Sequence, residues 1–232
     1  MSTAMASSAA LAQPKSLFAR IIGIFINPRE TMDDIAARPS WIVPMVLLIL
    51  TSALSVLLLQ EAIMDKAVVE MTKSNPNMTQ EQIDQAMPFV KGVTWISVLV
   101  GVPLINLIFA GLFIFIGNVI LGGQTNFKTA FSVTCWSGLI SVLGSLILIP
   151  IMRASGELIS PTSLSFLDSS GDEGSPLFFL FSQIDLFRIW GMIVLGLGFA
   201  AAYKFTSQKG IAVAMTVWGI FVVIGTALKA IF

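Results

Sequence analysis

The sequence lacks the side chains on which most catalytic and metal-binding sites depend. Its 232 residues include no histidine and a single cysteine, Cys135. The absence of histidine excludes histidine-based catalytic triads, histidine-ligated metals and histidine proton relays. One cysteine excludes an internal disulfide and a cysteine-based zinc site, so Cys135, within an apolar stretch, is expected to act as a small buried hydrophobe. No Gly-x-x-x-x-Gly-Lys phosphate loop is present. We therefore expect no enzymatic activity, no metal and no cofactor.

Charged residues are also scarce, at 11% of the chain, whereas 56% of the residues are hydrophobic. A soluble domain has about 25% charged residues. Five stretches contain no Asp, Glu, Lys or Arg, namely 39–60, 92–127, 129–152, 189–203 and 210–228. A helix needs about 20 mostly apolar residues to cross a bilayer, which four of the five stretches supply. The fifth, 189–203, needs its flanks as well.

The sequence therefore predicts an all-α, polytopic integral membrane protein with five transmembrane helices. The predicted spans are about 41–59, 95–121, 127–151, 184–203 and 211–228. Together they form one membrane domain over residues 41–232. Residues 15–40 are predicted to form cytoplasmic interfacial and short helices. Residues 1–14, rich in serine and alanine and free of charge, are predicted to be a disordered tail.

An amphipathic pattern lies before the first predicted span. Four large apolar side chains fall near one face of a helix over residues 15–26, and basic residues lie beside them. That pattern favours a helix at the membrane interface, so we take its apolar face as a candidate interaction face. Its residues are Leu17, Phe18, Ile21 and Phe25.

Local signals predict further breaks in the chain. Asn27, Pro28 and Glu30 are typical of a helix start, which predicts a second helix over 28–37 that ends before Pro39. The first loop is expected to continue the first transmembrane helix beyond the bilayer as far as residues 75–77. A capping box at 79–82 is expected to open a short helix that stops before Pro88.

The distribution of charge favours a cytoplasmic N-terminus. Five spans place the two termini on opposite sides, with seven basic residues on the N-terminal side and six on the other. The two short turns on the N-terminal side contain three lysines, and acidic residues number three on that side against ten on the other. Basic residues close to the spans favour the cytoplasmic side. In the third loop, an apolar patch at 177–181 is either re-entrant or rests on the interface.

Two polar residues of the second span are candidate intramembrane contacts. Asn106 and Asn118 lie about 18 Å apart along a helix, and each can bond to a neighbouring helix or contact a solute. Near the fourth span, Asp185 and Arg188 are three residues apart on one helical face, which predicts an ion pair at the membrane edge. Ser137, Ser141 and Ser145 are spaced by four, which favours close internal packing or, alternatively, a homodimer face.

Several short motifs, in order along the chain, resemble one known family. They are Asn-Pro-Arg-Glu-Thr-Met at 27–32, Arg-Pro-Ser-Trp-Ile-Val-Pro at 38–44, Gly-Gly-Gln-Thr-Asn-Phe-Lys at 122–128, Cys-Trp-Ser-Gly-Leu at 135–139 and Asp-Leu-Phe-Arg-Ile-Trp at 185–190. Their order and spacing resemble the Yip-one domain family over roughly residues 20–232. The resemblance implies a five-span membrane protein with a cytoplasmic N-terminus.

Eukaryotic members of that family interact with Rab-type (Ypt) small GTPases and shape Golgi and endoplasmic-reticulum membranes. This chain lacks their Asp-Leu-Tyr-Gly-Pro motif before the first span and has a single tyrosine, Tyr203. It looks more like the bacterial members, which implies an inner-membrane location, or the Golgi and endoplasmic-reticulum membranes in a eukaryote. Rab binding is therefore not carried over.

Two functions follow as hypotheses. The first is a non-enzymatic protein that organises or scaffolds membrane or partner proteins through the N-terminal helices. The alternative is a small transporter or channel for an uncharged or lipidic solute. The expected partners are the lipid bilayer and a membrane or cytoplasmic protein, with a homo-oligomer as a further option, and no nucleic acid.

Overall fold

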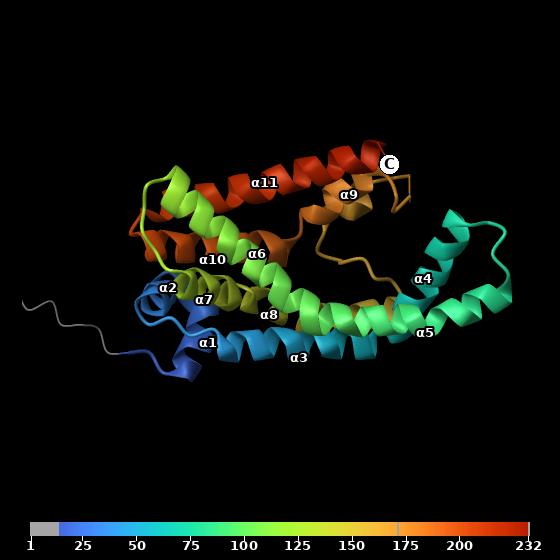
Figure 1. Ribbon diagram of the computed structural model, residues 1–232, viewed down its shortest axis with the longest axis horizontal. Coiled ribbons are helices and arrows are strands. Elements are labelled where there is room, and N and C mark those ends of the chain that lie inside the picture. Colours follow the sequence, from blue (N-terminus) through green and yellow to red (C-terminus); the bar gives the residue numbers. More distant parts are fainter. Residues whose placement is uncertain (1–13, 171, 232) are drawn as a thin grey trace, which may run out of the picture.

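The computed structural model describes residues 14–170 and 172–231, and within these ranges the regular structure consists of helices (Figure 1). All but Pro14 of the tail predicted over residues 1–14 lies outside the described residues. The α-helices are α1 (Leu17–Ile26), α2 (Pro28–Ala37), α3 (Ile42–Leu58), α4 (Gln60–Ser74), α5 (Gln80–Ile96), α6 (Val102–Ile114), α7 (Phe127–Ser137), α8 (Leu139–Ser155), α9 (Pro176–Gln183), α10 (Leu186–Tyr203) and α11 (Ser207–Ile231). Two π-helical segments, η1 (Ser97–Gly101) and η2 (Phe115–Ile120), and a 3₁₀ turn, η3 (Leu164–Leu167), complete them.

The helices confirm the predicted all-α polytopic membrane fold. Four helical segments among the described residues are long and apolar enough to cross a bilayer: Gln80–Ile120, Phe127–Ser155, Leu186–Tyr203 and Ser207–Ile231. A fifth span results if α3 and α4, which meet at a bend of 72°, are counted as one crossing. The candidate spans therefore number four or five, and they include the four predicted after the first loop.

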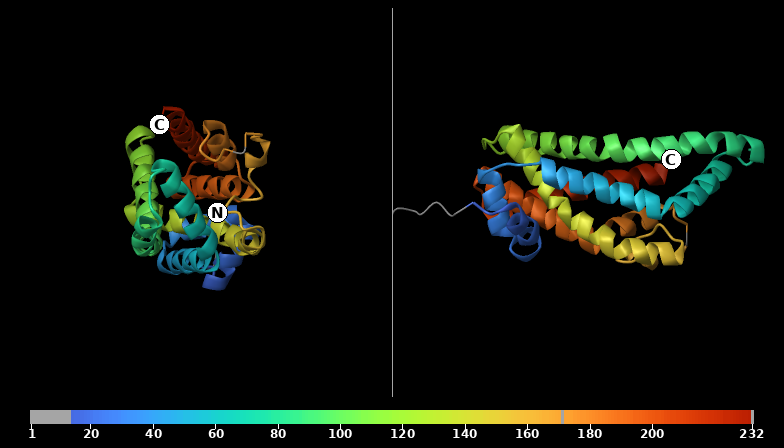
Figure 2. Two further views of the ribbon diagram at one scale, coloured as in Figure 1. Left: turned by 90° about the vertical axis from the view of Figure 1, so that its right-hand side faces the viewer. Right: turned by 90° about the horizontal axis from the view of Figure 1, so that it is seen from below.

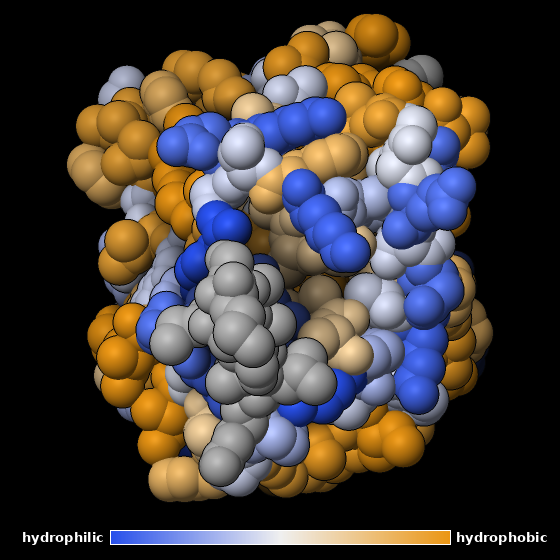
Figure 3. Space-filling view, turned by 90° about the vertical axis from the view of Figure 1, so that its left-hand side faces the viewer, coloured by the Kyte–Doolittle hydropathy of each residue, from blue (hydrophilic) through white to orange (hydrophobic). Residues whose placement is uncertain are grey.

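The spanning helices run along the long axis of the molecule (Figure 1). At one end, α1 and α2 lie beside the turns at 122–126 and 204–206. We call this the cap end. At the other end, the outer end, α4 and the start of α5 form a hairpin that projects beyond the other helices (Figure 2). Hydrophilic side chains gather on the cap-end face and hydrophobic ones around its rim, as a polar end of a membrane bundle requires (Figure 3).

The first loop is helical as far as Ser74, as expected, but its helix does not keep the direction of the first span. α4 meets α3 at a bend of 72° at Leu59. No proline or glycine marks this bend. Leu59 is buried, α4 packs against α5, and Lys66 of α4 forms an ion pair with Glu173 of the third loop. Tertiary contacts thus fix the direction of α4.

The helix that opens at Thr79 also departs from expectation, because it does not stop before Pro88. The capping box is present: the Thr79 hydroxyl accepts from the Gln82 N–H, and the Gln82 side chain accepts from the Thr79 N–H. The helix then runs through Pro88 and Pro103 to Ile120, over 41 residues. Proline removes one hydrogen bond and disfavours a helical residue before it, but a helix can continue through a proline with a kink. The π-helical segment η1 precedes Pro103 and loosens the helix there.

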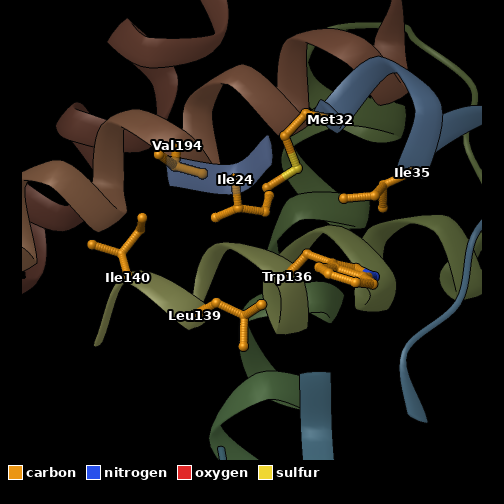
Figure 4. Packing of buried hydrophobic residues seen from close by; sticks show 7 residues of the cluster. All are labelled: Ile24, Met32, Ile35, Trp136, Leu139, Ile140 and Val194. Carbon is orange, nitrogen blue, oxygen red and sulfur yellow. The ribbon is translucent and has the colours of Figure 1, made fainter. Parts of the chain in front are cut away.

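The N-terminal helices form part of the hydrophobic core. The largest buried cluster joins side chains of α1, α2, α7, α8 and α10, namely Ile24, Met32, Ile35, Trp136, Leu139, Ile140 and Val194 (Figure 4). The Trp136 indole N–H donates to the Ser40 carbonyl at 2.6 Å, which fixes the segment between α2 and α3. The α1–α2 pair is therefore built into the bundle as a cap. We refer to residues 17–37 as the cap.

Glycine residues let several elements approach closely. A Cβ atom on Gly196 of α10 would lie 2.5 Å from the Ile211 Cα atom and 2.9 Å from the Gly210 carbonyl oxygen, both in α11. Side chains added at Gly117 or Gly123 would collide with the Tyr203 ring, whose hydroxyl donates to the Phe113 carbonyl at 3.2 Å. These glycines therefore serve close packing within the chain.

Candidate functional site

The predicted site residues fall in two places, the cap and a cavity between the spanning helices. The cap contains the candidate interaction face. The cavity contains Asn106 together with Asp185 and Arg188, whereas Asn118 lies elsewhere.

The helices of the cap begin as the sequence predicts. The Ser16 hydroxyl accepts from the Ala19 N–H and caps α1. In α2, Pro28 is the first residue and the helix ends at Ala37, as predicted. The Asn27 side chain does not bond to the backbone of α2. It donates to the Glu30 carboxylate at 2.6 Å, so the predicted helix start is correct and the capping bond differs.

A buried charge network joins α1 to α2. The Arg20 guanidinium donates through Nε to the Asp34 carboxylate at 2.6 Å and through a terminal nitrogen to the Ser40 hydroxyl at 2.8 Å. Arg38 pairs with the other Asp34 oxygen, and the Lys15 N–H donates to it at 3.3 Å. Both Arg20 and Asp34 are buried. The sequence analysis missed this network, although Asp34 and Arg38 carry the helical spacing of an ion pair.

The network controls the ionisation of Asp34. Burial alone would raise the pKa of this carboxyl. Hydrogen bonds from Arg38, Arg20 and the Lys15 N–H outweigh that effect, so the pKa lies below its usual value of 3.8. The carboxylate is therefore charged near neutral pH and binds the guanidinium groups of Arg20 in α1 and of Arg38, the residue that follows α2.

The candidate interaction face divides into two parts. Ile21 and Phe25 are partly buried against the core cluster, and the Phe25 ring meets the Trp190 ring edge-on at 6.2 Å between centroids. The other two candidates, Leu17 and Phe18, are exposed. They are joined on the surface by two further apolar side chains of α1. We call the exposed set Leu17, Phe18, Ile22 and Ile26 the apolar stripe.

A cavity of about 540 Å³ lies between α3, α6, α7, α8 and α10. It begins beside Thr134 and Leu195 in the middle of the bundle and reaches Ser160 and Ser182 at the outer end. Its wall is mostly apolar. Hydroxyl groups interrupt that wall on three helices, from Ser52 and Ser55 of α3, Ser137 of α7, and Ser141 and Ser145 of α8.

Asn106 lines this cavity from α6. Its side-chain amide donates to the Val102 carbonyl of the same helix at 2.9 Å. The backbone carbonyl of Asn106 accepts from the Thr134 hydroxyl of α7 at 3.4 Å. The expected bond to a neighbouring helix therefore involves the backbone of Asn106 and not its side chain. The side-chain oxygen of Asn106 has no hydrogen-bond partner within the described part of the chain.

Asn118 does not face the cavity. Its side chain forms two hydrogen bonds of 3.1 Å with the backbone of Thr125, one as donor and one as acceptor. It thereby closes the turn between η2 and α7. The two asparagines of the second span are thus not brought together at one site.

At the outer end of the cavity, Asp185 and Arg188 lie close but do not form the predicted ion pair. The Asp185 carboxylate accepts from the Ser160 and Thr162 hydroxyls and from the N–H groups of Phe187 and Arg188, so it caps α10. The Arg188 guanidinium instead donates to the Gln183 side chain. The capping role of the acid was not recognised from the sequence, although an aspartate before an apolar helix is a typical cap.

The three evenly spaced serines of the third span have different surroundings in the structure. Ser137 is buried and donates to the Thr134 carbonyl. Ser141 and Ser145 line the cavity, and neither hydroxyl has a hydrogen-bond partner within residues 14–170 and 172–231. The sequence favoured close internal packing or, alternatively, a homodimer face for these serines. Ser141 and Ser145 instead face a space whose wall also includes residues of α3 and α6.

One comparison with known proteins gives a match. A family model described as the Yip1 domain matches residues 22–228, from within α1 to near the end of α11. No curated protein matches the chain, and no solved structure matches it.

Proposed function

Because this chain belongs to the Yip1 domain family, we propose that it is a non-catalytic membrane protein that organises or scaffolds partner proteins. The docking surface is the apolar stripe of the cap. The cap end faces the cytoplasm. Lys128, Lys204 and Lys209 in or beside the two short turns at this end support that orientation, and acidic residues are more numerous at the outer end.

The observation that carries this proposal is an exposed apolar surface on a firmly attached helix. Large apolar side chains on a soluble surface mark an interaction site when they form a continuous patch. The stripe does so along α1, whose opposite face is fixed by Ile24 and by the Arg20–Asp34 pair. α1 also lies across the long axis of the bundle at its polar end, where a helix can rest on the membrane interface (Figures 1 and 2). Its outward apolar side chains then meet the interface and a partner protein bound there.

The test is a double substitution, Leu17→Asp with Phe18→Asp. In-cell crosslinking of a tagged chain, followed by mass spectrometry, should identify a specific partner with the native stripe. Two carboxylates on the stripe remove its apolar contact area, so we expect recovery of that partner to fall at least about tenfold, which corresponds to 1.4 kcal/mol of binding free energy.

A matched control lies at the outer end. Val69 and Phe89 are 48% and 74% exposed, close to the 48% and 72% of Leu17 and Phe18. Val69→Asp with Phe89→Asp should leave crosslinking unchanged. Equal recovery of the partner with both double variants would show that the stripe is not the docking surface.

The cavity favours the alternative function, a small transporter or channel for an uncharged or lipidic solute. Its wall combines apolar and hydroxyl groups, which suits such a molecule. Of the two asparagines expected to line a solute path, only Asn106 faces it. A solute path through both asparagines is therefore not proposed.

A further inference from the structure

The cavity has the size and shape of a ligand site. Its volume of about 540 Å³ lies within the roughly 300–1,000 Å³ typical of small-molecule pockets. Toward the cap end the space is filled, because every residue of α7 from Thr129 to Ser137 is buried. Toward the outer end the cavity reaches the third loop and the start of α10. The cavity therefore extends from the outer end to the middle of the bundle.

The lining of the pocket suits an acyl chain with polar linkages. Leu48, Ile105, Phe109 and Leu148 supply apolar wall on three helices. Without a ligand, a cavity with such an apolar wall would hold little water, because each water molecule needs several polar partners. The hydroxyls of Ser141 and Ser145 are free to donate within the described residues. A glycerolipid offers both features, a hydrocarbon chain and ester carbonyls that accept hydrogen bonds.

The charged residues at the outer end of the cavity indicate which kind of headgroup a bound glycerolipid would carry. Arg188 is the only basic residue that lines the cavity, and it is exposed there. Among the described residues no carboxylate forms an ion pair with it. Asp185 is the only acidic residue of the lining, and its carboxylate is occupied by four donors. The guanidinium is therefore left to bind an anion, and a phosphate suits its forked geometry.

From these three observations we infer that the cavity binds one anionic glycerophospholipid of the surrounding membrane. One acyl chain lies between α3, α6, α8 and α10. The ester carbonyls accept from Ser141 and Ser145, and the phosphate meets Arg188. This site is separate from the proposed docking surface, because no residue of the apolar stripe lines the cavity.

The experiment uses the full chain, purified in detergent and equilibrated with equal amounts of phosphatidylglycerol and phosphatidylcholine. Native mass spectrometry then counts the lipids that stay bound. One phosphatidylglycerol per chain should be retained in preference to phosphatidylcholine. Ser145→Phe fills the cavity and should abolish retention. Arg188→Gln removes a charged hydrogen bond and should weaken binding roughly tenfold.

Each variant has a matched control on α8. Leu146→Phe adds a ring at a neighbouring position that is exposed and does not line the cavity, and Arg153→Gln removes a charge from the same end of the bundle. Both controls should bind like the native chain. If Ser145→Phe does not elute as the native species, Arg188→Gln still decides, since its side chain is exposed and its loss leaves the core intact.

Two results would overturn the inference. Phosphatidylglycerol retained equally by Ser145→Phe and Leu146→Phe would place the lipid outside the cavity. Equal retention of both lipids, unchanged by Arg188→Gln, would show that the headgroup is not recognised. Neither result bears on the stripe, which is tested separately by the Leu17 and Phe18 substitutions.

Discussion

Replacement of Asp34 with asparagine should detach α1 from the bundle. The substitution leaves the buried Arg20 guanidinium and the neighbouring Arg38 without a counter-ion. Removal of one partner from a buried ion pair costs about 3–5 kcal/mol, because the remaining charge stays desolvated and uncompensated. That is a large share of the stability of a folded domain, about 5–15 kcal/mol in total. The loss falls on the contact between α1 and α2, so α1 should open while the spanning helices remain folded.

Hydrogen–deuterium exchange of the chain in lipid nanodiscs measures this opening. Amides over residues 17–26 should exchange much faster in Asp34→Asn, whereas those of α10 should keep their native protection. Asp33→Asn is the matched control on the same helix. Asp33 is exposed and its ion pair with Arg29 spans 3.5 Å, so its loss should cost no more than about 1 kcal/mol. Equal exchange in the two variants would contradict a structural role for the buried network.

The pH dependence of the same contact follows from the lowered pKa of Asp34. A carboxyl whose pKa is lower in the folded state stabilises that state above its unfolded pKa, and the stabilisation is lost as the pH falls through the folded value. The attachment of α1 should therefore be constant from neutral pH down to the ordinary aspartate pKa of 3.8 and weaken below it. Exchange at residues 17–26 that already rises between pH 7 and 5 would point to another group.

The second large effect is expected at the contact between α10 and α11. In Gly196→Ala, the added methyl group would meet Ile211 Cα and N and the Gly210 carbonyl oxygen at 2.5–2.9 Å. These are backbone atoms, so no side-chain rotation relieves the contact and the two helices must separate. Overpacking costs typically 1–3 kcal/mol and occasionally more. We expect about 3 kcal/mol, measured as the free energy of unfolding in mixed micelles of increasing denaturing-detergent content.

Glycines of the same helices provide the controls. A Cβ atom on Gly191 of α10 would lie 3.9 Å from Ile140 Cβ, an ordinary contact, and one on Gly219 of α11 would meet nothing within 4 Å. Gly191→Ala and Gly219→Ala should be neutral or slightly stabilising, since alanine favours the helix by about 0.5–1 kcal/mol over glycine. If all three variants have the same free energy of unfolding, the close approach at Gly196 does not stabilise the packing of α10 against α11.

The spanning helices could be predicted because each depends on a local property of the sequence. A long uncharged stretch crosses a bilayer regardless of its neighbours. The ends of α2 and the capping box at Thr79 follow from residues three or four apart in the sequence. The bend at Leu59 and the continuous helix through Pro88 could not be predicted in this way. The bend depends on contacts of α4 with distant segments, which no local pattern records. Pro88 is exposed, and the helix continues through it with one backbone hydrogen bond fewer.

The candidate sites show the same limit. The amphipathic pattern of α1 placed its apolar side chains near one face, but it could not show that Ile21 and Phe25 face the core and that Ile22 and Ile26 face outward. That division depends on where α8 and α10 lie. The acid of the predicted ion pair, Asp185, caps α10 instead, because the hydroxyls of Ser160 and Thr162, more than twenty residues earlier, are brought to it.

The burial of Cys135 has a practical chemical consequence. This thiol is the only one in the sequence, and it has no exposed surface in α7. Maleimide reagents therefore meet no accessible native thiol on the folded chain, and the native cysteine need not be removed before labelling. Cysteines introduced at exposed sites, as in Asn77→Cys at the outer end or Gln208→Cys at the cap end, become the sole targets for a membrane-impermeant reagent. The interior position of one sulfur atom thus makes the native chain a ready background for reading which end of the bundle faces the cytoplasm.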